Sequence, residues 1–383
     1  MIHCKTKEEK FAVTLYDSVA YLPKGWNDAL PQDHFLQTAQ LTVTEQSNFP
    51  DVSFQYAFIS LKGKPFAIAY FQVLHVKPYH VETAKLTPLQ GSAWQVFSKL
   101  YHPKLLVAGH LFRHDVASFF YPEDAEPFEV YQCYDAAIRA ALKKSGADAI
   151  LVKDMPQSLI TYFQHYAPQY LLLRNDITME MAISNEWESL KDYEKSLKHK
   201  YAQRLRKVRQ QWDKLEVTEL NALETEKNKE IIFNLYKQVT NKQQVRFGYL
   251  SADYIPTLKK NYPDDFHVWM AYEQDVPVAF FSAWSKGEAF DMFYIGFDYS
   301  RNEALQLYFN ILFFSVEQAI TLRKQKLVLG RTALEAKARV GCKPVYLSTF
   351  LYIKNSLVRS AMLRMQQNVA DNEGEWENRH PFK

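Results

Sequence analysis

The chain has 383 residues, of which 47% are hydrophobic, 15% aromatic and 23% charged, which is the composition of a globular protein. Its length predicts two domains or one large doubled domain. With 46 Lys and Arg against 43 Asp and Glu, the formal net charge of +3 argues against bulk nucleic-acid binding, so any basic surface must be local.

The three cysteines, Cys4, Cys133 and Cys342, lie far apart, and none belongs to a CxxC pair. This usage suits a reducing compartment and excludes a disulfide framework and a thiolate zinc site. The N-terminus lacks the apolar core and cleavage site of a signal peptide. The most apolar stretch, 304–320, is interrupted by polar residues and is too short to span a bilayer. We therefore expect a cytoplasmic protein.

The first half is predicted to mix strands and helices. Residues 56–76 read as two β-rich runs around a Lys-Gly-Lys turn, which is typical of a hairpin. Four elements follow, in the order strand, helix, strand and strand, at 105–112, 130–146, 149–155 and 177–183. Gly146 ends the predicted helix, with two lysines in its last turn.

The second half is predicted to repeat this order of elements. Residues 267–297 read as a meander of three strands, with turns near 274–275 and 286–287. A loop at 298–304, a long apolar helix at 305–323 and a strand at 326–330 follow. Each half thus runs hairpin, strand, loop, helix, strand. We interpret this as a repeat of architecture, not of residues.

An amphipathic helix is predicted to join the halves, which divides the chain into 1–185, 186–214 and 215–383. Its apolar stripe recurs every three or four residues, at Leu190, Tyr193, Leu197, Tyr201, Leu205, Val208 and Trp212. Lys200, Arg204 and Lys207 lie on one flank of the stripe, Lys198 and Arg209 lie on the other, and Arg206 is nearly opposite it. The pattern fits either a solvated helix face or a binding surface for a polyanion.

Three stretches, taken in order, resemble the tandem acetyltransferase-like fold of the GNAT superfamily, and most closely its Fem-type branch of peptidoglycan aminoacyltransferases. They are the basic helix KHKYAQRLRKV (198–208), the meander, loop and helix from His267 to Arg323, and KLVLGRTALEAKARVGCKP (326–344). The resemblance implies an α/β (α+β) fold of two tandem acyl-CoA N-acyltransferase (GNAT-like) domains. Each domain would be a mixed, mostly antiparallel sheet flanked by helices.

The same resemblance implies an N-acyltransferase that moves an acyl or aminoacyl group from acyl-CoA or aminoacyl-tRNA to an amine. The acceptor would be a small molecule or a cell-envelope precursor, and no metal is expected. Both donors are polyanions, which a local basic surface can bind. The candidate donor-binding residues are Lys200, Arg204, Lys207, Arg301, Arg331 and Lys337. The Gly-rich pyrophosphate signature of single-domain acetyltransferases is absent, because no glycine lies between Gly296 and Gly330.

Asp291, Tyr294 and Glu335 are the candidate catalytic residues, because acyl transfer to an amine needs a base and an acid. Asp291 stands in an apolar strand, and only a β-bulge would bring Tyr294 to the same site. The alternative is a strand-edge carboxylate that faces water. Glu335 follows a strand end, and the alternative there is a surface ion pair with Arg331, with Lys337 exposed.

The loop NKQQVRFGYL (241–250) offers Arg246, Phe247 and Tyr249 as candidate acceptor-binding residues, although aromatic side chains at a helix end more often pack against it. His110 and His114 are four residues apart, but a strand running into a loop does not give them metal-binding geometry. P-loop, dinucleotide, zincin and hydrolase motifs are absent from the sequence. Two other functions stay open: a catalytically inactive tandem scaffold, and a nucleic-acid-binding protein that uses the basic helix.

Overall fold

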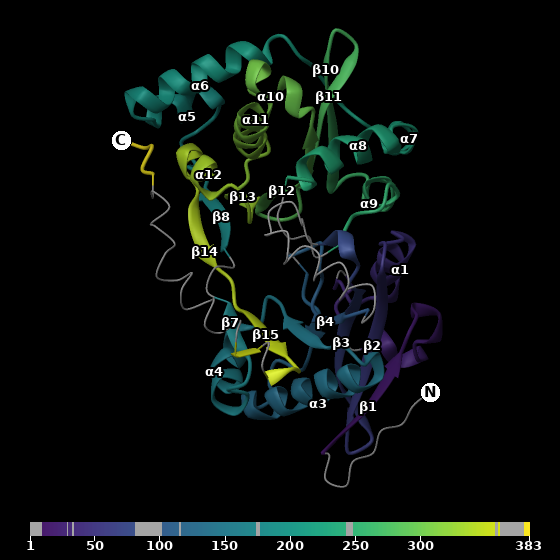
Figure 1. Ribbon diagram of the computed structural model, residues 1–383. Helices are drawn as coiled ribbons and strands as arrows, with labels where there is room; N and C mark the ends of the chain where they lie inside the picture. Colours follow the sequence, from purple (N-terminus) through teal and green to yellow (C-terminus); the bar gives the residue numbers. More distant parts are fainter. Residues whose placement is uncertain are drawn as a thin grey trace. The chain divides into compact units, whose positions relative to one another are not determined.

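Two compact units, which interleave along the sequence, make up the computed structural model in Figure 1. The structure describes residues 10–28, 30–32, 34–80, 102–114, 116–173, 177–242, 248–356, 359–360 and 379–383. The first unit takes the described residues within Met1–Arg174, Gln244–Ser251 and Leu347–Asp371. The second takes those within Asn175–Gln243, Ala252–Tyr346 and Asn372–Lys383. The boundaries drawn from sequence at 185 and 214 both fall inside the second unit.

The sheet of the first unit is mixed, and β4–β6 is its parallel pair. Its spatial order is β1 (Phe11–Tyr16), β2 (Val52–Leu61), β3 (Lys64–His75), β4 (Lys104–Ala108), β6 (Ala149–Val152), β15 (Thr349–Ile353) and β7 (Leu171–Leu173), with β5 (Phe119–Phe120) beside β3. The predicted hairpin is confirmed, and Lys62 and Gly63 make its turn with φ of 51° and 79°. The strand expected at 105–112 is shorter than predicted. It ends at Ala108 because Gly109, with φ of 141°, leaves the extended conformation.

Helices cover both faces of this sheet. The α-helices are α1 (Thr38–Gln46), α3 (Pro127–Ser145) and α4 (Gln157–Tyr166), and the short 3-10 turns are η1 (Val19–Tyr21), η2 (Lys24–Trp26) and η3 (Pro78–His80). On one face α3 and α4 share a core with Ala57 and Ile59 of β2. On the other face Tyr56 of the same strand packs with Leu41 of α1, as strand alternation requires. The predicted end of α3 at Gly146 is confirmed by its φ of 67°.

The sheet of the second unit is also mixed, and its parallel pair is β12–β13. Its order is β14 (Lys343–Tyr346), β8 (Ile177–Ala182), β13 (Lys326–Gly330), β12 (Ala289–Phe297), β11 (Val276–Trp284), β10 (Phe266–Glu273) and β9 (Glu216–Glu219). The meander is confirmed, and Gln274 and Asp275 turn β10 into β11 with φ of 50° and 65°. Both sheets are mostly antiparallel and carry helices, so the predicted fold class is confirmed.

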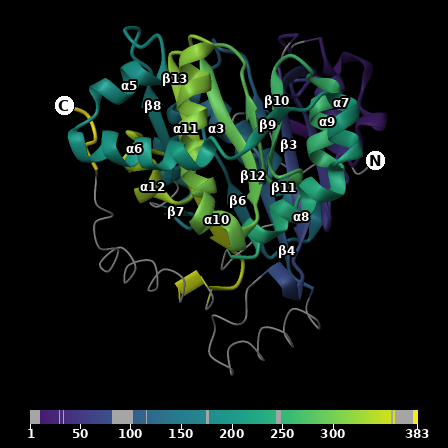
Figure 2. The ribbon, with the colours of Figure 1, turned by 90° about the horizontal axis from the view of Figure 1, so that it is seen from above.

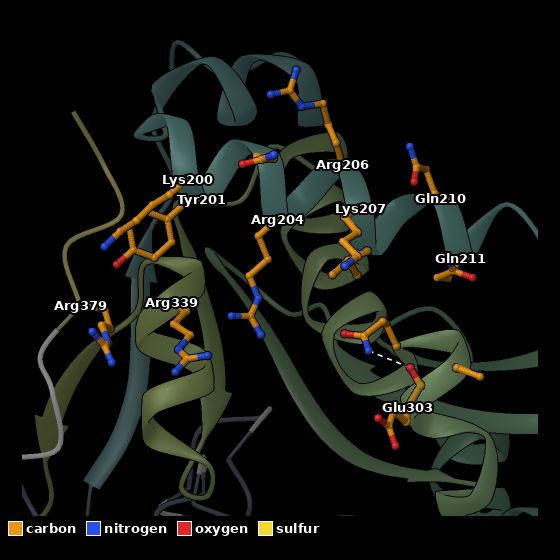
Figure 3. Close-up of a pocket in the computed structure, with 14 residues that line it drawn as sticks. Lys200, Tyr201, Arg204, Arg206, Lys207, Gln210, Gln211, Glu303, Arg339 and Arg379 are labelled. Carbon is orange, nitrogen blue, oxygen red and sulfur yellow. Dashed lines mark hydrogen bonds between the residues drawn. The ribbon is translucent and has the colours of Figure 1, made fainter.

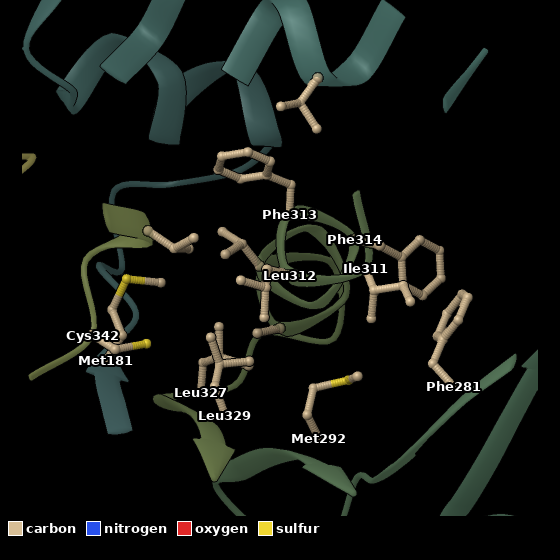
Figure 4. Close-up of a cluster of buried hydrophobic side chains, with 14 of the residues drawn as sticks. Met181, Phe281, Met292, Ile311, Leu312, Phe313, Phe314, Leu327, Leu329 and Cys342 are labelled. Carbon is tan, nitrogen blue, oxygen red and sulfur yellow. The ribbon is translucent and has the colours of Figure 1, made fainter. Parts of the chain in front are cut away.

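The core of the second unit is built around α11, as Figure 4 shows. Its helices are α5 (Leu190–Ser196), α6 (His199–Trp212), α7 (Ala222–Lys227), α8 (Lys229–Thr240), α9 (Tyr254–Asn261), α10 (Tyr299–Leu305), α11 (Leu307–Thr321) and α12 (Leu334–Val340). Side chains of α11 such as Ile311 and Phe314 pack against Met292 and Phe281 of the sheet. Truncating one buried Phe to Ala in such a core costs about 3–5 kcal/mol.

The loop expected at 298–304 is wrong, because these residues form most of α10. Asp298 caps this helix by accepting a hydrogen bond from the Ser300 N–H at 2.9 Å. The long helix expected at 305–323 therefore starts only at Leu307. Gln306, with φ of 50°, separates α10 from α11, and the Asn302 side chain accepts from the Tyr308 N–H at 3.0 Å.

The joining helix expected over 186–214 is in fact two helices, α5 and α6. They are separated where Leu197 forms an antiparallel bridge with Phe382 and the Lys198 N–H donates to the Pro381 carbonyl at 2.8 Å. The predicted stripe is confirmed in large part, since five of its members are buried: Tyr193, Leu197, Leu205, Val208 and Trp212. The helix α6 lies across α11, as Figure 2 shows, and the Arg209 guanidinium there pairs with Glu317 at 2.9 Å.

Within the part of the chain that the structure describes, no helix combines the length and apolar character needed to cross a membrane.

Candidate functional site

Two neighbouring strands in the second sheet separate part-way along their length. The parallel pairing of β12 with β13 covers three residue pairs, the last of which joins Asp291 to Val328. Beyond it β12 stays paired with β11 as far as Phe297, whereas β13 follows β8 to Gly330. A pocket of about 410 Å³ lies at this separation, between apolar residues of β12 and α11 and the segment 329–333.

A β-bulge in β12 accompanies the pocket. Phe293 and Tyr294 together oppose the single residue Ser282 of β11. The Ser282 hydroxyl donates to the Tyr294 carbonyl at 3.0 Å and accepts from the Tyr294 N–H at 3.2 Å, so the bulge is fixed from both sides. A bulge is the condition for a shared site of Asp291 and Tyr294, and β12 has one at Phe293 and Tyr294, opposite Ser282. A joint role of the two side chains stays a prediction.

The carboxylate of Asp291 does not face water at a strand edge, since only 7% of the residue is exposed. Met292 and Phe293, next to it along β12, line the pocket. The ring of Tyr294 packs edge-on against Tyr236 at 5.8 Å between ring centroids. Burial, followed by the neighbouring tyrosines, raises the pKa of Tyr294 well above its ordinary value, so this phenol stays protonated.

Gly296 allows a helix to lie directly on β12 behind the pocket. A Cβ at Gly296 would overlap the backbone nitrogen of Tyr236 in α8. The close approach places Val239 of the same helix in the pocket wall. Glycine is therefore required here for backbone packing, not for turn formation.

Lys337 is a buried cation that lines the pocket. It lies on α12, and only 4% of the residue is exposed, which corrects the alternative of a solvent-exposed lysine. Burial lowers the pKa of Lys337 to about 8, and Cys342 and Asp291 oppose this shift. An amine with such a pKa exists partly as the free base near neutral pH, so it can both accept and return a proton.

Glu335, two residues before Lys337 on α12, holds two arginines in place. Its Oε1 atom accepts hydrogen bonds from Arg339 at 2.6 Å and from Arg379 at 2.9 Å. The bond from Arg339 is the largest cause of the lowered pKa of Glu335. The predicted alternative, a surface ion pair between Arg331 and Glu335, is therefore wrong for the described residues. Ala333, with φ of 53°, starts α12 and leaves Arg331 on the preceding segment, in the pocket lining.

The basic flank of α6 faces a second, larger cavity of about 1140 Å³, shown in Figure 3. We call this cavity the cationic groove. Its charged lining consists of Lys200, Arg204, Arg206, Lys207, Arg339, Arg379 and Glu303. The Arg204 guanidinium stacks over the Phe309 ring, 4.3 Å from its centroid. The predicted flank of Lys200, Arg204 and Lys207 thus lines one cavity, whereas Arg209 on the other flank pairs with Glu317.

Similarities to known proteins are of fold only. No protein-family model and no curated protein matches the sequence. Among solved structures, a tandem GNAT protein from the clavulanic acid biosynthesis pathway is 7% identical with a TM-score of 0.49, covering 90% of this chain and 99% of that one. FemX is 9% identical with a TM-score of 0.46, covering 84% and 92%. Saccharomyces cerevisiae N-myristoyltransferase with bound myristoyl-CoA is 8% identical with a TM-score of 0.49, covering 91% and 80%.

Two of these structures, the tandem GNAT protein and FemX, bear names of the kinds that the sequence resemblance names. At these TM-scores and identities the likeness assigns no activity to this chain.

The remaining predicted residues do not belong to the pocket lining or lie outside the described residues. Arg301, on α10, pairs with Glu273 and lies 3.7 Å from Asp298, so its charge is engaged within the fold. Tyr249 belongs to the first unit, where its ring lies 5.7 Å from that of Tyr79. Arg246 and Phe247 lie outside the described residues.

The first unit also has a buried lysine directly after its parallel strand pair. This lysine donates hydrogen bonds to main-chain carbonyl groups. Lys153 directly follows β6, and its ammonium donates to the carbonyls of His110 at 2.6 Å and Arg113 at 3.4 Å. A Cβ at Gly109 would lie 2.9 Å from the Lys153 Cβ, so the two segments stay close beyond the strands. The lysine here stabilises the fold. Within the described ranges, no group of three or more His, Cys, Asp or Glu side chains is arranged to hold a metal ion.

Proposed function

We propose that the protein is an N-acyltransferase that moves an acyl group from an activated carrier to an amine. The reaction is placed in the pocket where β12 and β13 of the second unit separate. The observation that carries the proposal is the buried Lys337 amine, with its pKa lowered to about 8, in the wall of a largely apolar pocket. The predicted tandem GNAT-like resemblance supports the same reaction class.

The separated strand supplies a second requirement of acyl transfer. The β12–β13 ladder ends at Asp291, so the main chain of β12 beyond this residue is not paired to β13. Backbone N–H groups on that edge are fixed donors that can stabilise the oxyanion of a tetrahedral intermediate. The walls around Met292 and Ile295 are apolar, and hydrogen bonds are stronger in such surroundings than in water.

In the proposed reaction the free amine attacks the carbonyl carbon of the carrier's acyl group and forms a C–N bond. The bond from this carbon to the carrier breaks, and the carrier leaves with the electron pair. The neutral form of Lys337 accepts the proton that the attacking nitrogen loses, and the ammonium returns a proton to the leaving group. The products are an amide and the protonated carrier, so atoms and charge balance.

The residues predicted from sequence enter this proposal with different roles. Asp291 is a neighbour of Lys337 that favours its charged form, and Tyr294 is a protonated phenol that can donate a hydrogen bond. Arg331 lines the pocket as a donor contact. The donor-binding role of Lys200, Arg204 and Lys207 belongs to the cationic groove, and Glu335 acts by holding two of its arginines.

An acyl thioester such as acyl-CoA is the carrier that we propose. A tRNA partner finds no support in the solved structures, and the amine acceptor is a small molecule or cell-envelope precursor. A cytoplasmic location is part of the proposal. Its support is the cysteine usage, with Cys133 and Cys342 as buried free thiols.

The test is an assay of thiol release from a panel of acyl thioesters in the presence of primary amines, with mass spectrometry of the amide product. Lys337→Met removes the group that carries the proton in the proposed reaction, and we expect it to lower kcat/KM by about 10²-fold, the lower range for loss of acid–base assistance. Asp291→Asn and Tyr294→Phe keep side-chain size and should have smaller effects, because neither side chain carries that proton. Absence of amide product from every thioester and amine in the panel would leave a non-catalytic scaffold as the better account.

A further inference from the structure

The cationic groove concentrates positive charge in a protein that is nearly neutral overall. Six cationic side chains line it, from α6, α12 and the C-terminal segment, and Glu303 is the acid among the described residues of its lining. The whole chain has 46 Lys and Arg against 43 Asp and Glu, so this local excess does not follow from composition. Such concentrated charge creates a local potential that attracts anions.

Three of these cations are held in fixed positions, and a fourth, Arg206, pairs with Glu194 at 3.5 Å. Arg339 and Arg379 share a single oxygen of Glu335, and Arg204 is fixed by stacking on Phe309. Figure 3 shows Arg204 extending from α6 toward Arg339 on α12, with Arg379 beside it. Burial, and next the charge of Arg339, lower the pKa of Arg204. An anion bound between the two guanidinium groups would offset the repulsion of their like charges.

The dimensions of the groove suit a small ligand with more than one phosphate. Lys200 and Lys207 are seven residues apart on one helix, about 10 Å at 1.5 Å per residue. The volume of about 1140 Å³ is slightly above the range of roughly 300–1,000 Å³ for small-molecule sites, so the groove can hold an extended ligand. Guanidinium groups bind phosphate oxygens in pairs, and the Lys200 ammonium, 5.1 Å from the centroid of the Tyr201 ring, adds a further cation.

The groove and the acyl-transfer pocket share two helices. On α10, Asn302 lines the pocket and Glu303 lines the groove. On α12, Lys337 lines the pocket and Arg339 lines the groove. A ligand bound in the groove is therefore next to the site where the acyl group would react.

We propose that the cationic groove is a binding site for a multiply phosphorylated small ligand, with Arg204, Arg339 and Arg379 as its phosphate contacts. The inference rests on the proposed function only for the identity of the phosphorylated ligand. The ligand is either the nucleotide end of an acyl carrier or a phosphorylated acceptor, and both present phosphate groups to the groove. Arg339 and Arg379 are contacts that the sequence did not single out.

The test is isothermal titration of the full chain at 50 and 200 mM salt with inorganic triphosphate as the shared probe. Adenosine 3′,5′-bisphosphate stands for the carrier, and a uridine diphosphate sugar stands for the acceptor. We expect binding of triphosphate that weakens at the higher salt, because the contacts are charged. The nucleotide that binds more tightly identifies the source of the phosphates.

The variant Arg339→Gln/Arg379→Gln should weaken triphosphate binding at least tenfold. Lys200→Gln/Lys207→Gln, at exposed positions, gives the same test if the first variant does not fold. The control Lys191→Gln/Lys227→Gln removes two exposed charges of the same unit outside the groove and should change binding less than twofold. The titration does not depend on turnover. Absence of acyl transfer in the separate thiol-release assay, with intact triphosphate binding, would therefore contradict the proposed function and leave this site standing.

Three results would overturn the site: no triphosphate binding at 50 mM salt, equal binding by the wild type and both groove variants, or binding of an arbitrary single-stranded RNA at least tenfold tighter than any small probe. The last result would make the groove a nucleic-acid surface.

Discussion

Replacing Lys337 with methionine should make the protein more stable and less active. Lys337 is 4% exposed, and its pKa is lowered to about 8 from an ordinary value of 10.5. At 1.36 kcal/mol for each pH unit, this shift corresponds to about 3 kcal/mol of destabilisation by the buried charge at neutral pH. Methionine has a similar length and no charge, so Lys337→Met should recover roughly 1–3 kcal/mol of the free energy of unfolding.

The stability gained by Lys337→Met should also depend on pH. Below pH 8 the amine is protonated in both the folded and the unfolded protein, so the penalty is fully present. Between pH 8 and 10.5 the folded protein binds fewer protons than the unfolded one, so the wild type gains stability as pH rises. The stability difference between Lys337→Met and wild type should therefore be largest at pH 7 and smaller at pH 9.5.

Urea unfolding at pH 7 and pH 9.5, followed by tryptophan fluorescence, measures both differences. Lys227→Met is the matched control, because Lys227 is an exposed helical lysine of the same unit and should change stability by less than about 0.5 kcal/mol. Two results would refute a buried amine of lowered pKa: a Lys337→Met variant that is less stable than wild type at pH 7, or one whose stability differs from wild type by the same amount at pH 7 and pH 9.5.

Three further predictions concern the pocket and the groove. Gly296→Ala should lower the free energy of unfolding by about 1–3 kcal/mol, measured by the same urea titration, because the new Cβ overlaps the Tyr236 backbone; a neutral effect would show that α8 can move away. Glu335→Gln should raise KM for the acyl donor severalfold with kcat little changed, because it loosens Arg339 and Arg379 without touching the pocket; equal loss of kcat would contradict a positioning role. The kcat/KM of the wild type should rise with pH as the Lys337 amine loses its proton and level off above about pH 8, and a flat profile from pH 6 to 9 would exclude this amine as the base.

Much of the fold follows from local patterns in the sequence. The hairpin around Gly63 and the helix end at Gly146 were predictable because glycine at positive φ fixes each position. The stripe on α6 was predictable because burial of one face imposes the helical period. The break at Gln306 was not, because it depends on a non-glycine residue at φ of 50° and on the Asn302 cap of the next helix. The break at Leu197 depends on Phe382, a partner 185 residues away, which no local pattern reveals.

The candidate site was predictable in its segments but not in its geometry. Asp291 and Lys337 were singled out from apolar context and position, yet the burial of Lys337 depends on how α12 packs, and the charged Glu335 and Arg339 lie two residues to either side of it. The contribution of Arg379 to the groove depends on a C-terminal segment that returns to Glu335. An Arg three to four residues after a Glu on one helix is a signal that could have identified Arg339.

The measurement that tests the central claim most directly is amide formation from an acyl thioester and an amine by wild type, Lys337→Met and Lys227→Met, with each product quantified by mass spectrometry. The account predicts product from wild type and from Lys227→Met, and at least a hundredfold lower rate from a folded Lys337→Met. Undiminished transfer by Lys337→Met would contradict it.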